Sequence, residues 1–117
     1  MKKILVIDDE EDIVTFLTTL LEDNGYATIS ASNGNEGLEV ARREKPDLIT
    51  LDLLMPSQTG TDFYRNFVKD KDLADTPIIV VSGTAGRHLA VKKPAAVFEK
   101  PINPDAFLAA VQKALGE

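Results

Sequence analysis

Residues 48–52 read Leu-Ile-Thr-Leu-Asp, a short apolar run that ends in a carboxylate. The run is too short for a helix and rich in β-branched residues, which favours a β-strand. Its hydrophobicity is nearly continuous, as in strands that are buried on both faces of a parallel sheet. Similar runs recur, and the strands predicted from them are Ile4–Ile7, Leu48–Leu51, Ile78–Val81 and Ala95–Phe98. A fifth run, Ala27–Ala31, alternates with polar residues and predicts an edge strand.

Helical patterns fill the gaps between these runs. The first predicted helix ends at Asn24-Gly25, and its apolar stripe at helical spacing comprises Ile13, Phe16, Leu17, Leu20 and Leu21. A second helix stops before Pro46, and a third follows Gly60. Residues 85–93 carry a weak fourth pattern, and a fifth helix follows Pro104. This alternation of strands and helices predicts an α/β fold, with a parallel sheet covered by helices on both faces.

The composition excludes several classes of protein. The chain has 117 residues, the usual size of one domain, so we expect a single domain over residues 1–117. It contains no cysteine, which excludes disulfides and thiolate metal sites. A net charge of −6 argues against a direct nucleic-acid partner. No apolar run approaches the roughly 20 residues that cross a membrane, and no signal peptide is visible. We therefore expect a cytoplasmic protein with no membrane partner.

Polar residues end each central strand of the predicted sheet. They are Asp8-Asp9, Asp52, Ser82 and Lys100. In open α/β sheets, ligands bind outside the carboxyl ends of the strands. Carboxylates that meet there repel one another, and a hard cation such as Mg²⁺ relieves this repulsion. A lysine pairs with a carboxylate or phosphoryl group, and a serine hydroxyl can donate to a phosphoryl oxygen. Together these residue types predict an aspartyl-phosphate site.

Four motifs resemble those of response-regulator receiver domains. They are Ile7-Asp8-Asp9-Glu10, Leu51-Asp52-Leu53-Leu54-Met55-Pro56 followed by Gly60, Val81-Ser82-Gly83, and Lys100-Pro101. The resemblance covers essentially the whole chain, with the motifs in the same order. It implies a flavodoxin-like sheet of five parallel strands in the order 2-1-3-4-5, with five helices on both faces. It also implies a phosphorylation switch of two-component signalling, rather than an enzyme.

The resemblance also implies a role for each motif residue. Asp52 resembles the phosphoacceptor, and Asp8 and Asp9 resemble the acidic pair that holds Mg²⁺, with the backbone carbonyl of Leu54 and Asp52 as further ligands. Ser82 resembles the switch hydroxyl. Lys100 resembles the lysine that pairs with the phosphoryl group, and the bond before Pro101 is expected to be cis. The implied partners are a histidine kinase or histidine phosphotransfer protein and an unknown downstream protein.

The sequence departs from the family pattern at two places, and a third position bears on the lifetime of the phosphoryl group. Ser82 and Lys100 are 18 positions apart, about one helical turn fewer than in the family, so the fourth helix is expected to be short. Val97 stands where the family usually has an aromatic ring or His, so our hypothesis is that the loop after Ser82 carries the response to phosphate. Leu54 is apolar at a position that tunes water access, which predicts slow self-hydrolysis of the phosphoryl group.

Two other functions remain open from the residues alone. A phosphatase of the haloacid dehalogenase type also uses an Asp nucleophile and Mg²⁺, but it needs a second Asp where this chain has Leu54. A receiver-like binding module that no longer uses phosphate is compatible with Val97 and the short fourth helix.

Three other acidic residues, Glu10, Glu11 and Asp12, are interpreted as favouring the positive end of the first helix dipole. His88 receives no role.

Overall fold

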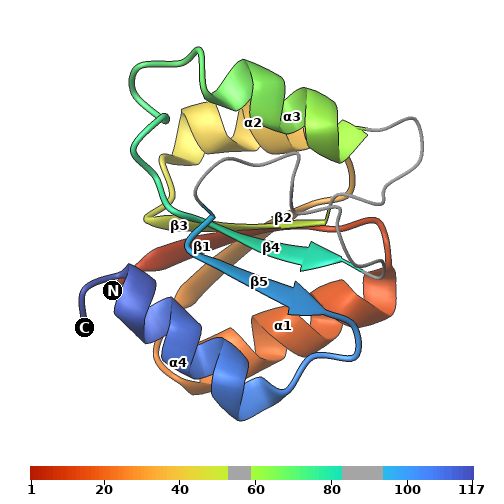
Figure 1. Ribbon diagram of the computed structural model, residues 1–117, viewed down its shortest axis with the longest axis vertical. Helices are drawn as coiled ribbons and strands as arrows, with labels where there is room; N and C mark the ends of the chain where they lie inside the picture. Colours follow the sequence, from red (N-terminus) through yellow and green to blue (C-terminus); the bar gives the residue numbers. More distant parts are fainter. Residues whose placement is uncertain (53–58, 83–93) are drawn as a thin grey trace.

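The computed structural model describes residues 1–52, 59–82 and 94–117 (Figure 1), with only the backbone for residues 59–62 and 82. Five parallel strands form one sheet in the order β2-β1-β3-β4-β5, which confirms the predicted topology. The strands are β1 (Lys3–Ile7), β2 (Ala27–Ala31), β3 (Leu48–Asp52), β4 (Ile78–Ser82) and β5 (Ala96–Glu99). Each lies within one residue of its predicted bounds, and the alternating run forms the edge strand β2.

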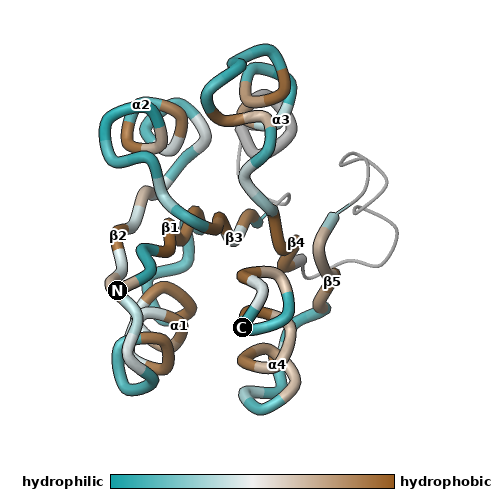
Figure 2. The backbone as a smooth tube through the Cα atoms, turned by 90° about the vertical axis from the view of Figure 1, so that its left-hand side faces the viewer, coloured by the Kyte–Doolittle hydropathy of each residue, from teal (hydrophilic) through white to brown (hydrophobic). Residues whose placement is uncertain are grey.

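Helices of the described residues cover both faces of the sheet, as Figure 2 shows. Successive side chains of a strand point to opposite faces. On β1, Leu5 and Ile7 belong to the apolar cluster under α2 (Gly34–Glu44) and α3 (Thr59–Phe67). Ile4 and Val6 belong to the cluster that includes residues of α1 (Glu11–Asp23) and α4 (Pro104–Ala114). Burial on both faces explains why the strand sequences are continuously apolar.

Asparagines cap three of the described helices, and α1 ends at the predicted Asn24-Gly25 signal, whereas α3 begins at Thr59, one residue before Gly60. Asn24 is the C-cap of α1, and Gly25 follows with a φ of 89°, a conformation that glycine adopts without strain. Asn33 and Asn103 cap α2 and α4, since their side chains accept hydrogen bonds from the backbone N–H groups of Glu36 and Ala106. The helix predicted over residues 85–93 lies outside the described residues, so α4 is the helix that the sequence places fifth.

The edge strand β5 separates two neighbouring side chains. Phe98 lies on the face toward α4, where its ring centroid is 5.7 Å from that of Phe107 in an edge-on arrangement. Val97 points to the other face and is 38% exposed. Phe98 therefore does not substitute for a ring at position 97. None of the helices in the described ranges is long and apolar enough to span a membrane.

Candidate functional site

The side chain of Lys100 lies among three carboxylates at the carboxyl ends of the strands. Its Nζ atom is 2.8 Å from Oε1 of Glu10, 3.2 Å from Oδ2 of Asp8 and 3.4 Å from Oδ2 of Asp52. Oxygens of the three carboxylates lie within 4.8 Å of one another. We call these four residues the acidic cluster. Because they come from three separate segments of the chain, only the fold brings them together.

Strand alternation explains why three of these side chains meet. Asp8 comes directly after β1, Asp52 ends β3 and Lys100 comes directly after β5. Each continues the series of alternate residues that faces α1 and α4. The sheet pairing extends as far as Asp8, because its backbone N–H donates to the carbonyl oxygen of Ala31 at 3.1 Å. The parallel register therefore brings three chemically active side chains to one edge and one face of the sheet.

The cluster is largely closed to solvent. The side chains of Asp8 and Asp52 are each 1% exposed, and that of Lys100 is 14% exposed. Burial raises the pKa of Asp8, and the charge of Asp52 adds to this effect. The backbone N–H of Glu10, which donates to Oδ1 of Asp8 at 2.9 Å, and the charge of Lys100 oppose it. The balance places the pKa of Asp8 at about 6, so its ionised form is costly in the folded protein.

Lys100 responds in the opposite sense to the same surroundings. Burial alone would lower its pKa, because it disfavours the charged ammonium. The hydrogen bond to Glu10 and the charges of Asp52 and Asp8 outweigh burial, so the pKa of Lys100 is raised above its usual range. Lys100 is therefore a permanent positive charge at neutral pH, and it compensates only part of the negative charge around it.

The donor set fits a hard divalent cation. Oδ2 of Asp8 is buried and accepts no hydrogen bond within the described part of the chain. Such an atom is costly to bury unless a charge or ligand satisfies it. Lys100 supplies a charge at 3.2 Å, but the three carboxylates of the cluster still exceed the single ammonium. Oxygen-rich, negatively charged sites are the sites that Mg²⁺ and Ca²⁺ prefer.

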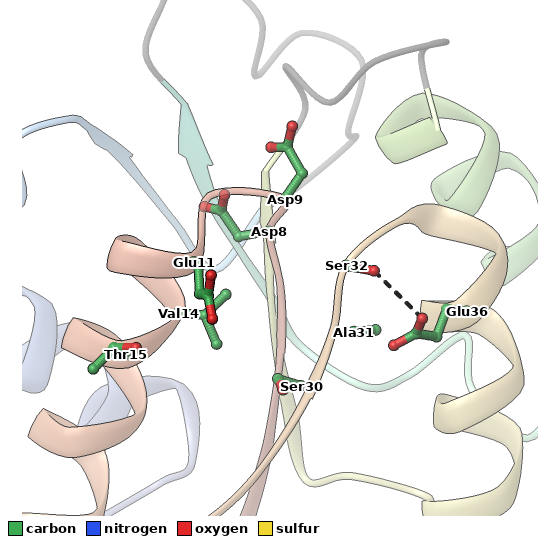
Figure 3. A pocket seen from close by; sticks show the side chains of 9 residues that line it. All are labelled: Asp8, Asp9, Glu11, Val14, Thr15, Ser30, Ala31, Ser32 and Glu36. Carbon is green, nitrogen blue, oxygen red and sulfur yellow. Dashed lines mark hydrogen bonds between the residues drawn. The ribbon is translucent and has the colours of Figure 1, made fainter.

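A cavity of about 450 Å³ adjoins the acidic cluster (Figure 3). Asp8 and Asp9 form part of its wall, and α1, β2 and the start of α2 supply the rest. The described lining contains carboxylates and hydroxyls and no basic side chain: Asp8, Asp9, Glu11, Val14, Thr15, Ser30, Ala31, Ser32 and Glu36. The hydroxyl of Ser32 donates to Oε2 of Glu36 at 3.4 Å. The cavity therefore extends the negative charge of the cluster toward α2.

Comparison with known proteins identifies the family. The family model of the response regulator receiver domain matches residues 4–112, nearly the whole chain.

The chain belongs to the response regulator receiver family.

Relatives and solved structures agree with this assignment. The chain is 32% identical over 113 residues to the protein Rrf1 of Nitratidesulfovibrio vulgaris, which covers 97% of this chain and 82% of Rrf1. It is 30% identical over 120 residues to the polar-differentiation response regulator DivK of Brucella anthropi, covering 99% and 98% of the two chains. The chemotaxis protein CheY4 of Vibrio cholerae superposes with a TM-score of 0.89 at 29% identity, covering 98% of this chain and 99% of that one.

Family membership settles the class of function. As a receiver domain, the chain is a phosphoacceptor module of two-component signalling rather than a classical enzyme. The function of a receiver domain therefore replaces the alternative of a haloacid dehalogenase-type phosphatase. A receiver domain also implies a cognate histidine kinase, which neither the fold nor the relatives name for this chain.

The predicted site residues of this receiver domain divide into four groups. Asp8, Asp52 and Lys100 meet as expected, and the bond between Lys100 and Pro101 is cis. Asp9 is exposed and lies outside the acidic cluster, and Figure 3 shows its carboxylate directed away from that of Asp8. Ser82 ends β4 beside Glu99 of β5, which places its backbone at the same edge of the sheet. Leu54 lies outside the described residues.

Glu10 is the residue that the sequence reasoning missed. Its carboxylate was assigned to the dipole of the first helix, whereas the structure directs it to Lys100 at 2.8 Å. Glu10 occupies the N-cap position of α1, yet its side chain makes no capping hydrogen bond. Ser, Thr, Asp and Asn are the residues that N-caps favour. A Glu at this position, directly after two strand-terminal aspartates, was the available signal that its carboxylate serves another purpose.

Proposed function

We propose that Asp52 accepts a phosphoryl group in a Mg²⁺-dependent reaction, with Lys100 as the cation that stabilises the transferred group. The observation that carries this proposal is the position of the Lys100 ammonium, 3.4 Å from Asp52 and 3.2 Å from Asp8, at a nearly buried edge of the sheet. A preorganised charge in such surroundings acts more strongly than in water. We also infer that residues 1–117 form one receiver domain.

The transfer itself needs a carboxylate nucleophile and a good leaving group. An oxygen of Asp52 attacks the phosphorus of a phosphohistidine, and a P–O bond forms as the P–N bond breaks. The electron pair of the broken bond stays on the imidazole nitrogen, which takes up a proton. The ammonium of Lys100 then faces the new negative charge. Because Lys100 remains protonated, it stabilises charge and does not act as the proton donor.

The remaining predicted residues complete this scheme. Asp8, Asp9, Asp52 and the backbone carbonyl of Leu54 would hold the metal, which is supported by the unsatisfied Oδ2 of Asp8. When bound, Mg²⁺ neutralises the charge that develops on the phosphoryl oxygens. Ser82 is proposed as the hydroxyl that turns toward the phosphoryl group, since it forms the last pair of β4 and β5 with Glu99.

The proposed partners are a histidine kinase or histidine phosphotransfer protein as donor and a downstream protein that reads the phosphorylated state. A phosphorylation switch needs two states that differ in their interaction with the phosphoryl group. Because Val97 offers no ring, the loop after Ser82 is our candidate for the moving element, and it lies outside the described residues. A cytoplasmic location and a slowly hydrolysed phosphoryl group stay predictions.

Incubation with acetyl phosphate tests this function directly. In the presence of Mg²⁺, we expect the intact protein to gain the mass of one phosphoryl group. The gain should vanish when Mg²⁺ is chelated and in Asp52→Asn, which preserves shape and removes the nucleophile. Circular dichroism should confirm that the variant is folded. A folded wild-type protein that gains no mass with Mg²⁺ and acetyl phosphate would instead favour a binding module that does not use phosphate.

A further inference from the structure

The start of α1 forgoes a common stabilising contact. The N-caps of α2 and α4 are asparagines whose side chains accept a backbone N–H. Glu10 occupies the same position in α1 without accepting one. Its side chain instead reaches across to Lys100, 90 positions away in the chain. The helix that begins at the acidic cluster thus gives up a cap, and its N-cap residue contacts the lysine of the site.

Among the described residues, Glu10 is also the nearest of the three partners of Lys100. An ammonium carries three N–H donors. In the acidic cluster, three carboxylates lie within reach of them, at 2.8 Å for Glu10, 3.2 Å for Asp8 and 3.4 Å for Asp52. A phosphoryl oxygen on Asp52 needs a donor from the same ammonium. The phosphoryl group would therefore compete with these partners for the charge and the N–H donors of Lys100.

Exposure decides which partner can leave. The side chain of Glu10 is 58% exposed, whereas those of Asp8 and Asp52 are 1% exposed. Glu10 can turn into water, where its carboxylate is hydrated at little cost. Asp8 is held by the backbone N–H of Glu10, which donates to its Oδ1 at 2.9 Å, and its side chain is almost completely buried. Of the described partners, Glu10 is the exchangeable one.

We propose that Glu10 is a positioning residue that holds Lys100 in the unphosphorylated protein and competes with the phosphoryl group for it. The inference rests on the proposed function of Asp52. Glu10 keeps the ammonium in place before transfer, and its release is a cost that the phosphorylated state must offset. Glu10 thereby sets how strongly this receiver domain favours its phosphorylated form.

Binding of beryllium fluoride, a mimic of the phosphoryl group, tests this role. Titration is followed by amide NMR at a Mg²⁺ concentration that saturates each variant. We expect Glu10→Gln to bind the mimic about threefold to tenfold more tightly than wild type, the range for one partly hydrated hydrogen bond to a charged group. Asp12→Asn is the matched control, because it removes the same charge from the exposed start of α1 without touching Lys100. Its affinity should equal that of wild type.

The variant Glu10→Asp distinguishes the effect of the contact with Lys100 from the effect of the negative charge at position 10. The shorter side chain keeps the charge but loses its reach to Lys100, so its affinity for beryllium fluoride should rise as in Glu10→Gln. It should also raise the melting temperature by a few degrees, because Asp can cap α1 where Glu does not. An affinity equal to that of wild type in Glu10→Asp would reduce the role of Glu10 to net charge and overturn the proposal.

The titration distinguishes failure of the role proposed for Glu10 from failure of the function proposed for Asp52. If wild type binds beryllium fluoride and Glu10→Gln binds it no more tightly, Glu10 does not compete for Lys100. If folded wild type with saturating Mg²⁺ binds none, the proposed function of Asp52 fails, and the role of Glu10 fails with it. Tighter binding in both Glu10 variants, with Asp12→Asn unchanged, supports the competition.

Discussion

Replacing Lys100 with Met is expected to lower the free energy of unfolding at pH 7 by on the order of 3 kcal/mol. The substitution keeps an apolar chain of similar length and removes the only ammonium within reach of Asp8 and Asp52 in the described part of the chain. Two buried carboxylates then face each other without the counter-charge of Lys100. The cost is that of leaving buried charges unpaired, which is larger than the net value of the ion pair itself.

The loss of stability in Lys100→Met should depend on pH. Without the ammonium, the pKa of Asp8 rises further, so the folded variant binds more protons than its unfolded form at mildly acidic pH. The deficit relative to wild type should shrink as the pH falls from 7 toward 5. Urea unfolding at both pH values, followed by circular dichroism, measures it. Lys113→Met in the last turn of α4 is the control for loss of an exposed positive charge. An equal, pH-independent deficit in both variants would contradict the account.

Asp8→Asn is expected to make the protein more stable at neutral pH, although it removes a site residue. Burial is the largest cause that raises the pKa of Asp8, to about 6, against about 3.9 in an unfolded chain. At pH 7 the ionised side chain therefore costs stability, and a neutral amide of the same shape avoids most of that cost. We expect a gain on the order of 1–3 kcal/mol in the free energy of unfolding, without Mg²⁺.

The direction of the pH effect follows from the raised pKa. Between about pH 4 and pH 6 the folded protein holds the Asp8 proton and the unfolded chain has lost it, so the contribution of Asp8 to stability falls as pH rises. The gap between wild type and Asp8→Asn should thus open across this window and stay constant above it. Saturating Mg²⁺ should narrow the gap by stabilising wild type more than the variant. Lower stability of Asp8→Asn at pH 7, with Asp12→Asn unchanged, would contradict this electrostatic origin.

The strands and the main site could be predicted together, because the same short sequence pattern marks both a buried strand and the site residue at its carboxyl end. A short apolar run that ends in Asp52 or Asp8 both marks a buried parallel strand and points its last side chain at the ligand edge. The alternation within each run then fixes the face, which is why Asp8, Asp52 and Lys100 meet as expected. The order of residues along each strand was sufficient to place these side chains, because successive side chains of a strand point to opposite faces of the sheet.

Glu10 and Asp9 could not be distinguished by the same reasoning. Both follow the end of β1, where the chain leaves the regular strand before α1 begins. There the direction of a side chain depends on the local turn and on partners far away in sequence, such as Lys100. From the sequence alone, each acidic residue in that turn can be explained equally well by a favourable interaction with the positive end of the helix dipole. Only the fold shows that Glu10 belongs to the acidic cluster and that Asp9 faces the adjoining cavity.

Chemical trapping of the phosphorylated residue tests the central claim most directly. Wild-type protein is treated with acetyl phosphate and Mg²⁺, then with borohydride, which reduces an aspartyl phosphate to homoserine and leaves free carboxylates unchanged. The peptide that contains position 52 is then sequenced by mass spectrometry. The account predicts homoserine at Asp52, and at no other position. Homoserine at a different aspartate, or a phosphoryl group that resists borohydride on a hydroxyl side chain, would contradict it.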